Sequence, residues 1–147
     1  MIRVYNTLSK QKENFQPLEE GKVGIYLCGP TVYDKSHIGH MVGPIIFDTI
    51  KRYLSFSGMD VTWVVNITDV DDKIIKRAAE NGESVDALTE RMIDAMHEDE
   101  GRLSVLRPDM EPRATAHIDD IIALVSTLID KGYAYCADNG DVYYRVE

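Results

Sequence analysis

The sequence predicts an α/β fold with a parallel sheet. Two mostly apolar runs of strand length, 23–28 and 61–67, flank a segment whose apolar residues recur at helical spacing. A strand–helix–strand order forms a right-handed parallel unit by default. The continuous apolar character of 23–28 indicates a strand that is buried on both faces. With 147 residues, 44% of them hydrophobic and 28% charged, the chain has the composition of one globular domain.

The first half of the chain contains the elements of this parallel unit. A short strand is expected at 3–6, followed by a polar loop. The helix between the two main strands is expected from about 38 to 56, and Gly58 supplies its stop signal. The second main strand, 61–67, is rich in β-branched residues, which favour extended backbone.

Helices and a hairpin are expected in the second half. The predicted helices are 70–80, 85–103 and 113–131. Gly132 ends the last of them, and the acidic stretch 86–100 is expected to form a solvated face. Asn139-Gly140, flanked by 133–136 and 142–146, is the strongest short signal for a β-hairpin.

Composition argues against several classes of protein. The formal net charge of -9 is unusual for a domain whose main task is to grip a phosphate backbone. No apolar stretch reaches the roughly 20 residues of a membrane span, and the polar start lacks the apolar core of a signal peptide. Cys28 and Cys136 are too few for a disulfide framework, so the reducing cytoplasm is the expected compartment.

Candidate functional residues follow the two main strands. Because ligands bind at the carboxyl ends of parallel strands, the loops 28–40 and 66–72 are expected to lie side by side at one edge. His37 and His40 are three residues apart at a helix start, so their side chains share a face. A helix N-terminus already favours anions, and two imidazoles there form a set of donors for a phosphate.

Other conspicuous residues have simpler structural interpretations. Trp63 lies in the middle of a strand and is expected in the core. Asp69, Asp71 and Asp72 precede a helix, where successive acids act as caps and dipole partners more often than as a metal site. His97 lies among charged residues of a helix, so a solvated position is expected.

Several motifs together carry a family resemblance. They are Cys28-Gly29-Pro30-Thr31-Val32-Tyr33-Asp34, His37-Ile38-Gly39-His40, Asn66-Ile67-Thr68-Asp69, Arg107-Pro108-Asp109-Met110 and Ala137-Asp138-Asn139-Gly140. With them, essentially the whole chain resembles the N-terminal part of the cysteinyl-tRNA synthetases, a family of class I aminoacyl-tRNA synthetases. The resemblance implies a Rossmann-like sheet: the first half of a nucleotide-binding catalytic domain in 1–112, then a helix and hairpin in 113–147 that lead into the connective insertion.

The resemblance also implies a reaction and an ATP site. In this family, ATP and cysteine give cysteinyl-adenylate and pyrophosphate, and the cysteine then passes to the 3′ end of tRNA(Cys). His37 and His40 match catalytic residues that contact the ATP phosphates. Gly29, Thr31 and Gly39 are implied as further parts of the ATP site, and Mg²⁺ accompanies the nucleotide.

The implied cysteine site includes a metal ion. Cys28 matches one of four zinc ligands, and the substrate thiolate binds that zinc; Gly29 and Thr68 are implied as further contacts to the substrate. A zinc–thiolate bond discriminates against serine, because a hydroxyl binds zinc far more weakly.

The sequence also departs from the family pattern. The other three zinc ligands, the second ATP motif Lys-Met-Ser-Lys-Ser and the tRNA-binding helical region are not found in these residues. A fragment or truncated copy that is inactive alone is therefore expected. Two alternatives remain: a non-catalytic module that binds a nucleotide or a protein, and the related cysteine ligase of mycothiol synthesis, which uses an amino sugar.

Overall fold

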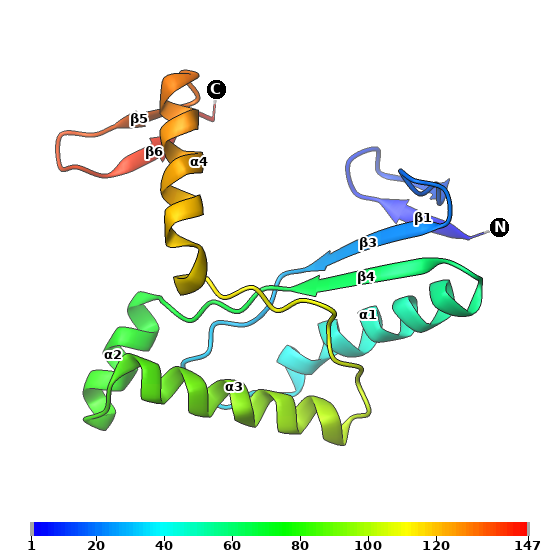
Figure 1. The fold of residues 1–147 in the computed structure, drawn as a ribbon, viewed down its shortest axis with the longest axis horizontal. Helices are drawn as coiled ribbons and strands as arrows, with labels where there is room; N and C mark the ends of the chain where they lie inside the picture. The colour runs from blue at the N-terminus through cyan, green and yellow to red at the C-terminus, as the bar shows by residue number, and fades with distance from the viewer. Residues whose placement is uncertain (1, 147) are drawn as a thin grey trace.

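The computed structural model describes residues 2–146 (Figure 1). Its strands are β1 (Arg3–Asn6), β2 (Gln11–Asn14), β3 (Lys22–Leu27), β4 (Asp60–Val65), β5 (Ala134–Cys136) and β6 (Val142–Tyr144). Its helices are α1 (Ile38–Phe56), α2 (Asp72–Asn81), α3 (Val85–Arg102), the 3-10 turn Thr115–His117 and α4 (Ile118–Asp130). The mixed α/β architecture agrees with the predicted fold class.

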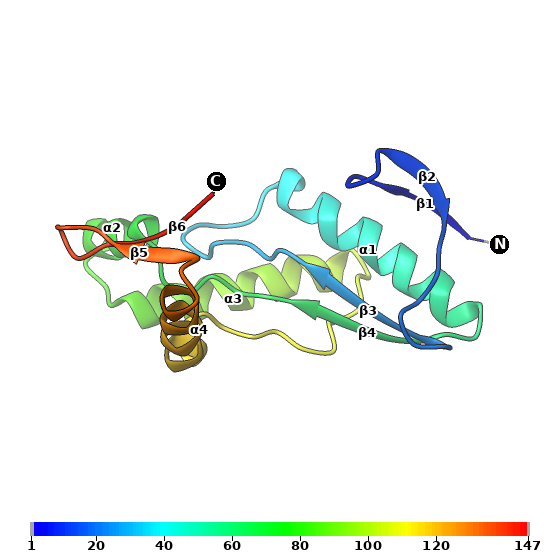
Figure 2. The same ribbon diagram turned by 90° about the horizontal axis from the view of Figure 1, so that it is seen from above.

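The centre of the fold is the predicted parallel unit. β3 and β4 pair in parallel, from Lys22 opposite Asp60 to Leu27 opposite Val65. α1 connects them and runs along one face of the pair (Figure 2). Trp63 in β4 is 1% exposed, as expected for a core residue.

A third segment extends this pair without forming a named strand. After α3 the chain returns beside β4, where the Val65 amide donates to the Met110 carbonyl at 3.0 Å. The Asp109 carboxylate accepts from the Trp63 amide and from the Lys51 ammonium, each at 2.6 Å. These contacts hold the pKa of Asp109 below its usual range, chiefly through the Lys51 hydrogen bond.

A second centre of packing lies under the predicted functional edge. α2 and α3 pack against each other at a wide angle (Figure 1), and their apolar side chains meet the first turn of α1 and the end of β4. Its buried members include Met41, Ile67, Ile74, Leu88 and Met92. The loop between β3 and α1 is anchored there by Val32, which is 3% exposed.

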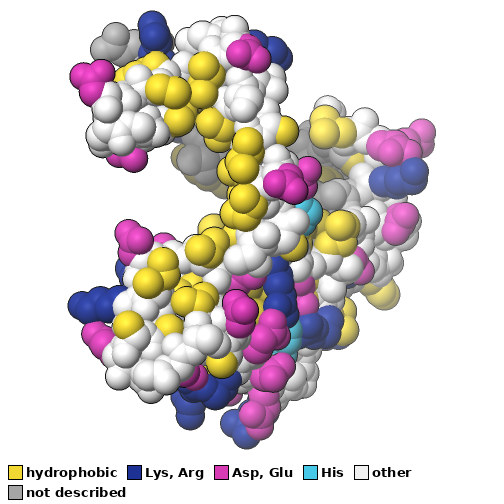
Figure 3. All heavy atoms as spheres, turned by 60° about the vertical axis from the view of Figure 1, so that its left-hand side comes forward, with side chains coloured by type: hydrophobic (Ala, Val, Ile, Leu, Met, Phe, Trp, Pro, Cys, Tyr) yellow, Lys and Arg dark blue, Asp and Glu magenta, His cyan; other side chains and the backbone are white. Residues whose placement is uncertain are grey.

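The C-terminal part projects from this body. α4 packs against β5, and the β5–β6 hairpin has the register Ala134–Tyr144, Tyr135–Tyr143 and Cys136–Val142, so the predicted hairpin is confirmed. No residue of α4 is buried. Figure 3 shows apolar side chains along this part and a deep hollow between it and the α2–α3 body.

Some element boundaries differ from the predictions because backbone groups form hydrogen bonds other than those of the predicted element. β2 forms in the expected polar loop, because the β1–β2 hairpin needs backbone pairing but little burial. α2 begins at Asp72 rather than at residue 70, because the Asp71 carboxylate caps it by accepting from the Lys73 amide at 2.8 Å. α4 begins at Ile118 rather than at 113, because the Ala114 amide donates to the Ile67 carbonyl and the next residues, Thr115–His117, form a 3-10 turn.

Three side chains expected at solvated or capping positions are placed differently. His97 is half-buried, and its Nε2 lies 3.0 Å from a Glu111 carboxylate oxygen. Glu100, in the stretch expected to be solvated, is 7% exposed. Asp69 caps no part of α2: it is buried and accepts from the Thr115 amide at 2.9 Å and from its hydroxyl. The partners of His97 and Asp69 lie 14 and 46 residues away in the sequence, so the local pattern contained no signal for these contacts.

Candidate active site

The two predicted loops meet at the carboxyl edge of β3 and β4. The Val32 amide donates to the Thr68 carbonyl and the Thr68 amide to the Pro30 carbonyl, each at 3.2 Å. Thr31 and Thr68 therefore form an isolated parallel bridge just beyond the ends of the strands. This edge is where a class of α/β proteins binds its ligands.

Gly29 allows the two strand ends to approach closely. A Cβ atom on Gly29 would lie 1.6 Å from the Asn66 carbonyl oxygen. The Asn66 side chain fastens this junction: its Oδ1 accepts from the Gly29 amide and from the Tyr26 hydroxyl at 2.9 Å, and its Nδ2 donates to the Thr68 hydroxyl at 3.4 Å. Asn66 is a residue whose role the sequence did not reveal, although it stands at a predicted strand end.

His37 and His40 form one unit at the start of α1. His37 is the N-cap: its Nδ1 accepts from the Gly39 amide at 3.1 Å, while the His37 amide donates to His40 Nδ1 at 3.2 Å. The two rings are stacked, with centroids 3.8 Å apart. Because both Nδ1 atoms accept hydrogen bonds, each neutral ring carries its proton on Nε2. The helix start therefore presents two exposed Nε2–H donors.

Gly39 allows the His37 ring to lie close against the start of α1. A Cβ on Gly39 would lie 2.9 Å from His37 Cε1 and 3.1 Å from His37 Nδ1. A larger residue there displaces the His37 ring before it meets any ligand. The space beside the Gly39 backbone is therefore occupied by the imidazole of His37.

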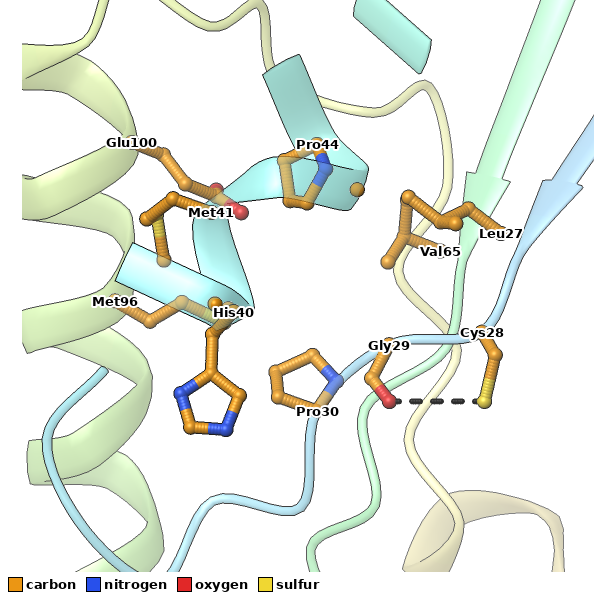
Figure 4. A pocket seen from close by; sticks show the side chains of 12 residues that line it. Leu27, Cys28, Gly29, Pro30, His40, Met41, Pro44, Val65, Met96 and Glu100 are labelled. Carbon is orange, nitrogen blue, oxygen red and sulfur yellow. Dashed lines mark hydrogen bonds between the residues drawn. The ribbon is translucent and has the colours of Figure 1, made fainter. Parts of the chain in front are cut away.

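A cavity of about 240 Å³ opens between the edge and α3 (Figure 4). It brings together four of the predicted site residues: Cys28, Gly29, Gly39 and His40. The other three do not line it: His37 stacks behind His40, and Thr31 and Thr68 pair with each other along the edge. The site residues therefore form a continuous edge with a cavity at one end.

Glu100 lines this cavity and was not expected there. Its side chain reaches the cavity from α3 beside Met41 and Pro44 (Figure 4). Within the described residues its Oε2 has no hydrogen-bond partner. Burial raises the pKa of the Glu100 carboxyl, and the Glu111 carboxylate adds to the rise.

The change Glu100→Gln is expected to stabilise the fold at neutral pH. Because the pKa of Glu100 is raised in the folded state, this group contributes to the free energy of unfolding in full below its unfolded-state pKa. The contribution is lost as the pH rises through the folded-state pKa. The Gln amide stays neutral at every pH, so the free energy of unfolding of the variant should be higher by on the order of 1 kcal/mol at neutral pH. Thermal unfolding from about pH 4 to about pH 8 measures this; a difference that does not change with pH would contradict it.

Cys28 offers one candidate metal ligand. Its thiol is exposed, and Sγ lies 3.8 Å from the Gly29 carbonyl oxygen. No group of three or more His, Cys, Asp or Glu side chains that could hold a metal ion is found among residues 2–146.

Comparison with known proteins decides the family. Residues 14–147 match the family described as tRNA synthetases class I (C) catalytic domain. The chain belongs to the class I cysteinyl-tRNA synthetase family. Curated cysteine–tRNA ligases of Chromohalobacter salexigens and Pseudomonas fluorescens SBW25 are each 66% identical to it, over 145 and 146 residues. That of Hahella chejuensis is 64% identical over 147 residues.

The similarity to these synthetases covers nearly the whole chain but only part of the relatives. The alignments include 99% or 100% of this chain and 32% of each relative's length. A solved structure titled as a putative arginyl-tRNA synthetase from Campylobacter jejuni matches with a TM-score of 0.66 at 12% identity, covering 88% of this chain and 38% of its own, which supports the fold alone. Among the described residues, no helix has both the length and the apolar character needed to cross a membrane.

Proposed function

We propose that this chain contributes the phosphate-binding edge of a cysteine–tRNA ligase. In the proposed reaction, a carboxylate oxygen of cysteine attacks the α-phosphorus of ATP, pyrophosphate leaves, and the cysteinyl group passes from the adenylate to tRNA(Cys). The observation that carries the proposal is the pair of Nε2–H donors that the cap of α1 orients. Family membership and the relatives' names agree with it.

The geometry suits stabilisation of charge on a phosphate. Both imidazoles are held by backbone hydrogen bonds before any ligand arrives, so little reorganisation accompanies the reaction. The dipole of α1 adds to the attraction, because its positive end lies beneath the two rings. Negative charge grows on the phosphate oxygens as the displacement proceeds, and donors aimed there favour the transition state over bound ATP.

The remaining edge residues have supporting roles in this proposal. Gly29 and Thr31 lie where the nucleotide would pass from the β3 end to α1, and Gly39 holds the His37 ring in place. Thr68, which is held by the bridge to Thr31, would contact cysteine in this proposal. Mg²⁺ would enter with ATP. In domain terms, 1–112 form part of the nucleotide-binding catalytic domain and 113–147 lead into the connective insertion.

Cys28 would contribute one thiolate to a zinc ion that binds the substrate sulfur. Because residues 2–146 hold no group of three or more His, Cys, Asp or Glu side chains suited to a metal ion, the proposal takes the other ligands from outside these described residues. The 147-residue chain purified without chelator is therefore expected to hold well under one zinc per molecule, measured by atomic emission. A stoichiometric zinc that resists chelators would contradict this. In the full-length protein, Cys28→Ser should lose zinc and cysteine activation together.

The acceptor of the activated cysteine distinguishes the proposed ligase from its relative in mycothiol synthesis. The full-length protein that carries this sequence is incubated with ATP and radiolabelled cysteine, with either tRNA or an amino sugar as acceptor. The proposal predicts labelled tRNA and no labelled amino sugar, in the cytoplasmic, reducing conditions that keep the exposed thiol of Cys28 free. Label on the amino sugar alone would contradict it.

A further inference from the structure

A small hollow on α2 lies outside the edge that carries the histidines. Its volume is about 250 Å³, and it is lined by Tyr33, Lys73, Lys76, Arg77 and Glu80. The α2 members are spaced by three, four and seven residues from Lys73, so they share one helix face. Tyr33 comes from the loop that leads to the catalytic histidines, which passes α2 and α3 on its way to α1 (Figure 1).

The hollow carries more positive than negative charge, in a chain whose net charge is -9. Arg77 pairs with Asp34 at 3.0 Å and reaches Glu80 only at 4.0 Å, and Lys76 reaches the same Glu80 at 3.9 Å. The Lys73 ammonium lies 5.8 Å from the centroid of the Tyr33 ring and forms no ion pair with a described carboxylate within 4.0 Å. Lys73 and Lys76 are therefore available to an external anion.

The same hollow offers an aromatic surface. Tyr33 is half-buried: it packs against the core cluster beneath α2, and its remaining surface lines the hollow. An aromatic ring beside cations is the combination with which proteins hold single-stranded nucleic acid: the ring contacts a base or sugar, and the cations contact the phosphates. The acids at the start of α2, Asp71 and Asp72, are not among the lining side chains.

We propose that this hollow binds the phosphates of the single-stranded 3′ end of tRNA. The inference rests on the proposed function, since that function requires the 3′ end to reach the edge formed by β3 and β4. Tyr33 stands four residues before His37, so a strand held at the hollow lies beside the loop that leads to the adenylate. Lys73 forms no ion pair within 4.0 Å and Lys76 is paired only at 3.9 Å, so the two lysines provide a modest affinity that suits a product that must leave.

The test compares Lys73→Gln/Lys76→Gln with Lys12→Gln in the full-length protein. Lys12 is an exposed cation on β2, at the opposite end of the molecule (Figure 1). In the double variant, kcat/KM for tRNA is expected to fall about tenfold, and the dependence of log affinity on log salt should weaken by about 0.7 per lysine. The Lys12 variant should match the unmodified protein in both measurements.

Two half-reactions separate this proposal from the proposed function. Binding of deacylated tRNA is measured without ATP or cysteine, and ATP–pyrophosphate exchange is measured without tRNA. Weakened tRNA binding in the double variant, with normal exchange, supports the hollow's role. Unchanged tRNA binding and salt dependence, or an equal loss in the Lys12 variant, would overturn it. A lack of cysteine-dependent exchange in the unmodified protein would instead count against the proposed function.

Discussion

Replacing His40 by Asn in the full-length protein should slow cysteinyl-adenylate formation by about 10²–10³, equivalent to about 2.7–4 kcal/mol of barrier. The Asn oxygen can take the place of Nδ1 and accept from the His37 amide, so the cap of α1 survives. What is lost is the Nε2–H donor toward the phosphate. ATP binding should weaken much less, because charge builds up there only in the transition state.

His40→Gln is the matched control for this prediction. The Gln amide nitrogen reaches the place of Nε2 but supplies no acceptor near Nδ1, so it should keep more of the rate while it weakens the cap. Pre-steady-state adenylate formation across ATP concentrations measures both effects. If His40→Asn raised the ATP requirement and left the maximal rate unchanged, the histidines would be ground-state binders and the assigned role would be wrong.

Gly29→Ala should destabilise the fold by at least about 3 kcal/mol, at the upper end of what overpacking costs. The new Cβ would meet the Asn66 carbonyl oxygen at 1.6 Å, and that oxygen belongs to backbone, which cannot rotate away. Relief requires the ends of β3 and β4 to separate, which breaks the Gly29–Asn66 hydrogen bond. Denaturant unfolding measures the loss, and failure to accumulate folded protein is its extreme form.

Gly24→Ala is the control on the same strand. No heavy atom lies within 4 Å of the place where its Cβ would be, and its φ is not in the left-handed region. Its effect on the free energy of unfolding should stay within about 1 kcal/mol. Equal stability of the two variants would show that the close approach at Gly29 does not support the fold.

The parallel unit could be predicted because its signals are local. The apolar runs that become β3 and β4, with a helical pattern between them, leave one favourable arrangement. The position of the two loops at one edge followed from that arrangement, and the bridge between Thr31 and Thr68 confirms it. The pairing of His37 and His40 was also predicted, and the structure makes it through a capping box in which His37 is the N-cap of α1.

The unpredicted features depend on contacts between distant residues. Nothing near Glu100 in the sequence indicates that it lines a cavity with His40. The same holds for Asp69, whose partner Thr115 is 46 residues away. The sequence around Asn66 indicates only the end of a strand, and its role becomes clear from the hydrogen bond with Gly29 in the fold. In each case tertiary packing decides the environment of a polar side chain, and a single sequence carries no direct record of it.

The most direct test of the central claim is cysteine-dependent ATP–pyrophosphate exchange by the full-length protein in the absence of tRNA. The account predicts exchange with cysteine, far less with serine, and near-complete loss when His37 and His40 are both changed to Asn. Tryptic digestion and circular dichroism would show that the double variant keeps its fold. Exchange that does not require cysteine, or that persists in the double variant, would contradict the claim that these two imidazoles stabilise the phosphate as cysteine is activated.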